Sequence, residues 1–329
     1  MGVPSGTLPS GGGGPAPGKP PRIWKNLGGD RPFSGGGTVR SWVGLGLVLL
    51  LGISTLWAAG SPFDPLKERL VRDGFSPKEV EALFSDPRVR FLPEIMPRKL
   101  TWDETKLPYR QFLRPERLRR ARAFLRDWGP FLSEVERDYG VEKEILVALL
   151  LVESDLGHHQ GRYGVFNVLA SMAASSHWER VRPYLPREIP PKEEARLQEI
   201  MRRRARWAYR ELRIFLEISR KYGLDPLALR GSIFGAFGYP QFVPSSFRDY
   251  AVDGDGDGRV DLYTLTDALA SAANYLRGHG WRPGLSPEEK KRVLMTYNHS
   301  EPYAETILEI AERLKGVDQK DELARTSSP

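Results

Sequence analysis

The feature that most constrains the fold is a run of apolar residues, spaced three and four apart, between Pro191 and Gly223. The run comprises Leu197, Ile200, Met201, Trp207, Ala208, Leu212, Phe215 and Ile218. This spacing places the apolar side chains on one face of a long helix that begins at a proline and ends at a glycine. The same spacing recurs at 115–128 and 131–139, and Ser-Pro-Lys-Glu at 76–79 is a capping-box signal. No strand-like alternation of convincing length occurs, so the sequence predicts a mainly α fold.

The first sixty residues differ in composition from the rest of the chain. Residues 1–40 are rich in glycine and proline, which predicts a disordered leader. Within 41–60, the stretch 42–59 is apolar and uncharged and follows several basic residues, so it reads as a signal peptide or a transmembrane anchor. The length of the leader slightly favours an uncleaved anchor. The basic residues that precede 42–59 predict that the rest of the chain is exported and is periplasmic or cell-wall-facing. If the apolar stretch is not cleaved, it would attach the protein to the cytoplasmic membrane.

Composition excludes several classes of site. The chain has no cysteine, which excludes disulfides, thiolate metal sites, a cysteine nucleophile and a lipidated cysteine. Its formal charge of +7 suits an anionic polymer such as a cell wall, whereas a nucleic-acid partner would need a denser basic patch, so none is predicted. The arginines between 202 and 210 are read mainly as a solvated helix face. The sequence does not indicate protein partners or an organic cofactor.

Glu153 is the first candidate for chemistry. It ends the apolar run 145–152, and on a helix over 141–154 it would share a stripe with Leu146, Leu149 and Leu150. Desolvation there would raise the carboxyl pKa, which suits a general acid. A structural carboxylate, paired with a buried arginine or capping a helix, is about equally compatible with this position.

The segment 231–246 is the second candidate. Three glycines precede a proline-bounded turn, and Tyr239 and Gln241 add an aromatic face and an amide. Sugars stack on aromatic rings and pair with amides, so the segment predicts a sugar-binding surface. A tight packing contact that requires small residues is the alternative.

The segment 253–261 carries the third and strongest local signal. Aspartates occupy positions 1, 3, 5 and 9 of an EF-hand-like loop, a glycine occupies position 6, and a backbone carbonyl would serve at position 7. The twelfth position is Thr264 rather than glutamate, so closure by Asp267 at position 15 is the alternative to a plain EF-hand. We therefore predict a structural calcium ion held by Asp253, Asp255, Asp257, the Arg259 carbonyl and Asp261, with either Thr264 or Asp267 closing the loop.

Taken in order, these motifs resemble those of one family. Val-Glu-Ser-Asp-Leu-Gly at 152–157, the segment 231–246, the aspartate loop, His-Gly-Trp at 279–281 and Tyr-Asn-His-Ser at 297–300 are similar to the membrane-bound lytic murein transglycosylase B family, glycoside hydrolase family 103. The resemblance covers roughly residues 62–315. It implies a lysozyme-like helical fold that cleaves the bond between N-acetylmuramic acid and N-acetylglucosamine in peptidoglycan and leaves a 1,6-anhydromuramoyl end.

The resemblance also implies roles for individual residues. Glu153 matches the single catalytic acid/base, and closure of the calcium loop at Asp267 is favoured over Thr264. Seven residues match positions that line the sugar groove: Ser232, Tyr239, Gln241, Tyr275, Tyr297, Asn298 and Tyr303. The implied partner is the glycan strand of peptidoglycan. Better-known members are lipoproteins with an insertion that the short stretch 282–296 lacks, which leaves one groove wall and the mode of anchoring open.

The expected organisation is an N-terminal helical subdomain at 61–130, a lysozyme-like catalytic core at 131–315 and a flexible tail at 316–329. Two other functions remain open at this stage. One is a muramidase of the same fold that uses water instead of the muramoyl 6-hydroxyl group. The other is a non-catalytic wall-binding protein anchored by residues 42–59.

Overall fold

A computed structural model of the chain describes residues 61–102 and 107–326, with side chains through residue 315. The predicted leader and the apolar segment 42–59 lie outside these residues, so their disorder, cleavage and anchoring stay predictions. Within the described ranges, no helix is both long enough and apolar enough to cross a membrane.

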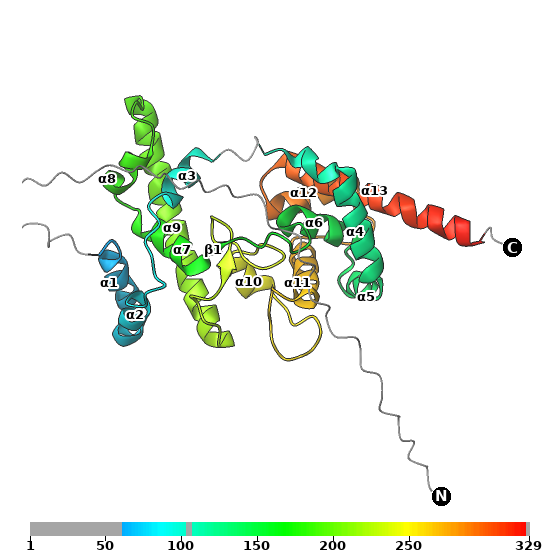
Figure 1. Cartoon of the computed structure of the whole chain (residues 1–329), viewed down its shortest axis with the longest axis horizontal. Helices are drawn as coiled ribbons and strands as arrows, with labels where there is room; N and C mark the ends of the chain where they lie inside the picture. Colours follow the sequence, from blue (N-terminus) through cyan, green and yellow to red (C-terminus); the bar gives the residue numbers. More distant parts are fainter. Residues whose placement is uncertain (1–60, 103–106, 327–329) are drawn as a thin grey trace, which may run out of the picture. The chain divides into compact units, whose positions relative to one another are not determined.

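The described residues are mainly helical, as predicted (Figure 1). In chain order the elements before the first strand are α1 (Asp64–Arg72), α2 (Pro77–Phe84), α3 (Ile95–Thr101), the 3-10 helix η2 (Tyr109–Leu113), α4 (Pro115–Asp127), α5 (Gly129–Tyr139) and α6 (Lys143–Ser154). After them come β1 (Tyr163–Gly164), α7 (Val165–Ala174), α8 (Trp178–Val181), η3 (Arg182–Tyr184), α9 (Pro191–Tyr222) and β2 (Arg230–Gly231). The chain continues through α10 (Pro244–Tyr250), α11 (Leu265–Gly278), α12 (Pro287–Tyr297) and α13 (Glu301–Thr326).

Helix α6 is the central element of the larger hydrophobic core. Every residue from Leu146 to Leu151 is fully buried, and α6 packs against α4 and α13 (Figure 1). The same core includes Phe63, Leu66 and Leu70 of the N-terminal part, because α1 packs against α7. One apolar cluster therefore extends across the expected boundary at residue 130, and the division into two subdomains stays a prediction. The expected tail from residue 316 begins within α13, whose backbone is helical to Thr326.

Helix α9 has the predicted bounds. It begins at Pro191, and Gly223 follows its last residue with a φ of +66°, the left-handed conformation that commonly ends helices. The predicted capping box of α2 forms only in half. The Ser76 hydroxyl accepts a hydrogen bond from the Glu79 N–H, but the Glu79 carboxylate instead pairs with Arg220 of α9 at 2.6 Å. A long-range ion pair has replaced the local bond.

The segment 231–243 is a compact loop, not a helix, and it supports one wall of the site described below. β2 pairs antiparallel with β1, with Tyr163 opposite Gly231, and single bridges join Gly231 to Phe237 and Phe237 to Phe242. A Cβ atom on Gly231 would lie 2.2 Å from the Ala236 carbonyl oxygen. Such close approach of two backbones requires glycine.

Candidate active site

Glu153 lies in the last turn of α6, where the helix leaves the core. The next two residues, Asp155 and Leu156, have φ values of +53° and +58°, an uncommon conformation for residues other than glycine. Their N–H groups bond back to the carbonyls of Leu151 and Leu150, which ends the helix at Ser154, one residue after Glu153. Glu153 thus lies at the end of a buried helix, and its carboxylate faces the pockets described below.

Asp155 anchors this turn. Its side chain is only 6% exposed, and Arg120 of α4 donates hydrogen bonds to its two carboxylate oxygens at 2.7 and 2.9 Å. Arg117 lies 3.8 Å away on the same helix. Asp155 is therefore committed to an ion pair and does not act as a second carboxylate beside Glu153.

Two pockets meet at Glu153. One, of about 260 Å³, is lined by Leu107, Tyr109, Gln111, Phe112, Val152, Glu153, Asn298 and Tyr303. The other, of about 700 Å³, is lined by Glu153, the loop 158–163, Ser232, Ile233 and Gln241. Among the described residues that line these two pockets, Glu153 alone carries a carboxylate.

Tyr303 holds the Glu153 carboxylate. Its hydroxyl donates a hydrogen bond to Oε1 of Glu153, and its ring packs edge-on against Tyr109 with centroids 6.0 Å apart. Burial, together with the nearby Glu153 charge, raises the pKa of Tyr303 well above its ordinary value. Tyr303 therefore stays protonated and remains a donor to one carboxylate oxygen.

The three predicted sugar-binding residues that are not tyrosines each line one of the two pockets. Asn298 lines the smaller pocket and ends α12, while Ser232 and Gln241 line the larger one. Ser232 Oγ accepts hydrogen bonds from the N–H groups of Phe234 and Ala236 and shapes its own turn. Gln241, at a φ of +50°, donates to the carbonyls of Gly238 and Gln160 and so ties together the two loops of that pocket.

The three other predicted tyrosines make contacts within the fold. Tyr275 is 8% exposed and donates to the Thr296 carbonyl, and Tyr297 donates to the Pro240 carbonyl. Tyr239 packs so closely on Gly157 that a Cβ atom there would lie 1.9 Å from its ring. None of the three is among the residues that line these two pockets.

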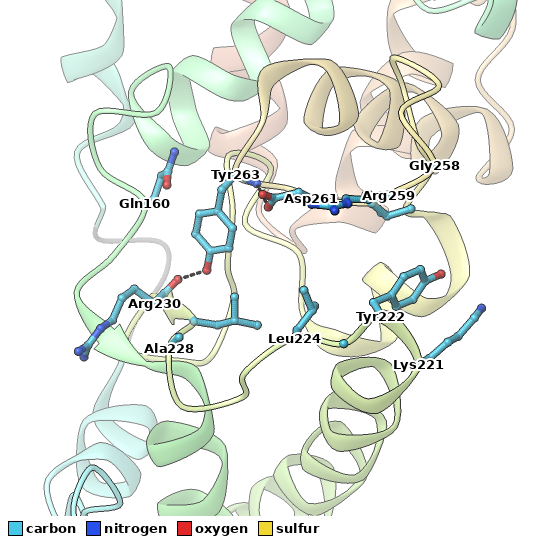
Figure 2. A pocket seen from close by; sticks show the side chains of 13 residues that line it. Gln160, Lys221, Tyr222, Leu224, Ala228, Arg230, Gly258, Arg259, Asp261 and Tyr263 are labelled. Carbon is cyan, nitrogen blue, oxygen red and sulfur yellow. Dashed lines mark hydrogen bonds between the residues drawn. The ribbon is translucent and has the colours of Figure 1, made fainter. Parts of the chain in front are cut away.

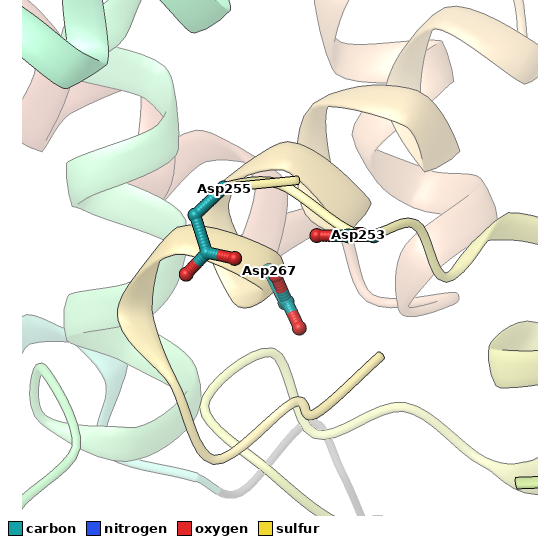
Figure 3. A group of neighbouring side chains, drawn as sticks. All are labelled: Asp253, Asp255 and Asp267. Carbon is teal, nitrogen blue, oxygen red and sulfur yellow. The ribbon is translucent and has the colours of Figure 1, made fainter. Parts of the chain in front are cut away.

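The aspartate loop forms a separate acidic cluster (Figure 3). Carboxylate oxygens of Asp253, Asp255 and Asp267 all lie within 4.8 Å of one another. Asp267 is 2% exposed and accepts hydrogen bonds from the Gly254 and Asp261 N–H groups, and burial raises its pKa. Thr264, at the twelfth position, instead caps α11. The fifteenth residue, not the twelfth, therefore meets the start of the loop.

The other predicted calcium ligands lie outside this cluster. Asp257 and Asp261 accept hydrogen bonds from the Arg259 and Tyr263 N–H groups at 2.8 Å, and both aspartates are exposed. They support the turns of the loop in this structure.

Comparison with known proteins places the chain in a family. A family model described as transglycosylase SLT domain matches residues 59–289, well over half of the chain. The chain belongs to the transglycosylase SLT domain family. Membrane-bound lytic murein transglycosylase B of Escherichia coli K12 is 34% identical over 179 residues, which is 54% of this chain and 43% of that protein. The match thus spans less than half of this family relative.

Solved structures of related lytic transglycosylases share the fold. Soluble lytic transglycosylase SltB1 from Pseudomonas aeruginosa is 26% identical, has a TM-score of 0.63, and the alignment covers 78% of this chain and 98% of that one. Escherichia coli Slt35, solved in complex with calcium, is 22% identical with a TM-score of 0.61, covering 78% of this chain and 93% of that one. The predicted lysozyme-like helical class is thereby confirmed at the level of the family fold.

Several pocket residues of this family member were not predicted from its sequence. Tyr109, Gln111 and Phe112 belong to η2 and reach the pocket from a part of the chain that precedes Glu153 by about forty positions. The loop 158–163 follows α6 and lines the larger pocket. No motif marks either segment, although the proximity of the loop to Glu153 in sequence was an available signal.

Proposed function

We propose that this protein is a lytic transglycosylase that cleaves the β-1,4 bond between N-acetylmuramic acid and N-acetylglucosamine in peptidoglycan, forming a 1,6-anhydromuramoyl end. Family membership and the similarity to lytic murein transglycosylase B support this assignment. The single observation that carries it is the isolation of Glu153 as the one carboxylate lining the two described pockets that meet at it.

A single carboxylate constrains the mechanism. Most glycosidases place two carboxylates on either side of the scissile bond, and substrate-assisted enzymes are among the exceptions. With Asp155 bound to Arg120, Glu153 must perform both proton transfers. Protonated Glu153 donates its proton to the glycosidic oxygen as the bond to the leaving sugar breaks. As a carboxylate it then removes the proton from the muramoyl 6-hydroxyl, whose oxygen attacks the anomeric carbon, so no water is consumed.

The surroundings of Glu153 suit this double role. Tyr303 binds one carboxylate oxygen and so helps to orient the carboxyl group at the two pockets. Asn298, which lines the same pocket, is the candidate to orient the acetamido group that stabilises the oxocarbenium-like centre. Ser232 and Gln241 lie at the larger pocket, where the strand would continue, while Tyr239, Tyr275 and Tyr297 support the walls.

The products decide the assignment. The full-length protein is incubated with purified sacculi, and the soluble fragments are identified by mass. A transglycosylase releases anhydromuramoyl ends, whereas a muramidase of the same fold releases reducing ends that are heavier by one water. Binding to sacculi without fragments, in the presence of calcium, would instead indicate a wall-binding protein.

We also propose that the aspartate loop holds a structural calcium ion. Hard oxygen ligands and flexible geometry suit Ca²⁺, and Asp253, Asp255 and Asp267 supply a convergent set. The buried Asp267 would be costly to ionise beside two like charges without a cation. Asp257, Asp261 and the Arg259 carbonyl would join by small movements of the loop. Slt35, which shares the fold, was solved with calcium.

Export is part of the same proposal. The substrate lies outside the cytoplasm, and the matching Escherichia coli protein is described as membrane-bound. Residues 42–59 supply the predicted signal or anchor, and peptidoglycan is the proposed partner.

A further inference from the structure

A pocket of about 960 Å³ in the described part of the molecule is not used by the mechanism above (Figure 2). One wall is the carboxyl end of α9 with the following turn, residues 221–224, and a second is the segment 228–230 before β2. The third is the segment 258–261 of the aspartate loop together with Tyr263. Tyr263 joins two of these walls, because its hydroxyl donates to the Arg230 carbonyl (Figure 2).

This pocket adjoins the larger of the two pockets at Glu153. Gln160 lines it and also lines the larger of the two pockets that meet at Glu153. The Gln160 backbone is held there by the Gln241 side chain, which donates to its carbonyl at 3.3 Å. Gln160 therefore places this third pocket next to the Glu153 region.

The lining combines positive charge with apolar surface. Lys221, Arg230 and Arg259 contribute three cations, all exposed, against the single carboxylate of Asp261. Throughout the described ranges, neither the Arg230 nor the Arg259 guanidinium has an ion-pair partner. Leu224, Leu229, Val260 and the Tyr263 ring supply the apolar part.

This chemistry does not match a sugar backbone. Guanidinium groups recognise carboxylates through paired N–H donors, whereas neutral pyranose rings bind best to aromatic faces and amides. In peptidoglycan the carboxylates and small apolar side chains belong to the stem peptides that branch from the muramoyl residues.

We propose that this pocket binds the stem peptide of the same strand whose glycosidic bond lies at Glu153. The inference rests on the proposed function and extends it from the sugar backbone to the peptide. Arg230 and Arg259 bind the peptide carboxylates, and Leu224, Val260 and Tyr263 contact its apolar side chains. The enzyme thereby prefers peptide-bearing strands to bare glycan.

The test compares two forms of one substrate, soluble uncross-linked strands with their stem peptides and the same strands after amidase removal of the peptides. The variants are Arg230→Ala and Arg230→Ala/Arg259→Ala, the second of which keeps the backbone carbonyl at 259. The control is Arg203→Ala on α9, which removes one exposed positive charge away from the pocket.

We expect wild-type protein to favour peptide-bearing strands and the double variant to lose about tenfold of that preference, as for loss of charge-assisted hydrogen bonds. The control should keep the wild-type ratio. An unchanged ratio in the double variant, with anhydromuramoyl products still released, would overturn the peptide site and leave the proposed function standing.

A binding measurement separates this inference from catalysis. Glu153→Gln protein is titrated with both strand forms, alone and combined with the two arginine substitutions, and the Kd is measured. Tighter binding of peptide-bearing strands that disappears in the arginine variants supports the site, whatever the products of the wild-type protein. Equal Kd values for the two strand forms would contradict it. Failure of wild-type protein to release anhydromuramoyl ends would separately contradict the proposed function.

Discussion

Glu153 and Asp267 are both carboxylates at the edge of the core, yet their neighbours differ in kind. Glu153 has a tyrosine hydroxyl on one oxygen, and the two described pockets at its side chain contain no second acid. Asp267 is almost fully buried with Asp253 and Asp255 beside it, and it accepts two backbone N–H groups. A lone carboxylate that faces a pocket can exchange a proton with a ligand. Converging carboxylates repel one another and suit a bound cation.

Substitution of Glu153 should have the largest effect on activity. Glu153→Gln keeps the shape of the side chain but removes its proton chemistry, so release of anhydromuramoyl fragments from sacculi should fall by about 10²–10⁴-fold. The matched control is Glu144→Gln, a buried acid on the same helix that does not line the two pockets. The Glu144→Gln variant should release anhydromuramoyl fragments at near wild-type rates. Near wild-type release by Glu153→Gln would remove Glu153 from the mechanism.

Removal of calcium tests the role of the Asp267 cluster. Chelation should destabilise the fold by about 2–3 kcal/mol at calcium concentrations that saturate the wild-type site, since the ion binds only the folded loop. Thermal unfolding of the full-length protein with and without calcium measures this. Asp253→Asn should unfold at a lower temperature and respond little to calcium. Identical wild-type melts in both conditions would show that the loop does not hold a stabilising ion.

Tyr303→Phe tests whether the Tyr303 hydroxyl orients the Glu153 carboxylate and lowers its pKa. Loss of the hydroxyl removes one hydrogen bond that orients the carboxyl group and should lower the rate by about tenfold, equivalent to ~1.4 kcal/mol. A donor to the ionised form lowers a carboxyl pKa, so its removal should raise the pKa of Glu153 and move the pH–rate profile to higher pH. Tyr209→Phe is the control. Tyr209 of α9 is also buried, and its hydroxyl donates a hydrogen bond to the Asp73 carboxylate at 2.7 Å, but it does not line the pockets at Glu153. A profile that moved to lower pH, or equal loss in the control, would contradict this role.

The smallest expected effect is that of Asp257→Asn, which tests whether the aspartates of the loop contribute equally to stability and calcium binding. Asp257 is exposed and lies outside the convergent group, and asparagine keeps a side-chain oxygen that can still reach the ion, so Asp257→Asn should change the unfolding free energy by only about 0.5 kcal/mol and keep the calcium response. Calcium titrations followed by thermal melts compare it with Asp253→Asn. An equal loss in both variants would mean that the loop rearranges more on binding than the three-residue cluster indicates.

Much of this organisation could be predicted from the sequence because its signals are local. The stripe of α9 and its terminal glycine follow from helical periodicity, and the apolar setting of Glu153 follows from the run before it. The aspartate spacing at 253–261 marked the loop. The half-formed capping box at Ser76 failed because Arg220, distant in sequence, competes for Glu79.

The sequence by itself determined the helical class, the buried helix that carries Glu153 and the acidic loop, since each depends on residues within a few turns of one another. Only the tertiary structure decided which groups face Glu153. Tyr303 of α13, η2 and the loop 158–163 meet there because the core brings distant segments together. It also decided that Asp155 is bound by Arg120, and that Gln160 lines both a pocket at Glu153 and a neighbouring cationic pocket. Such contacts arise from packing between elements, which no spacing along the chain encodes.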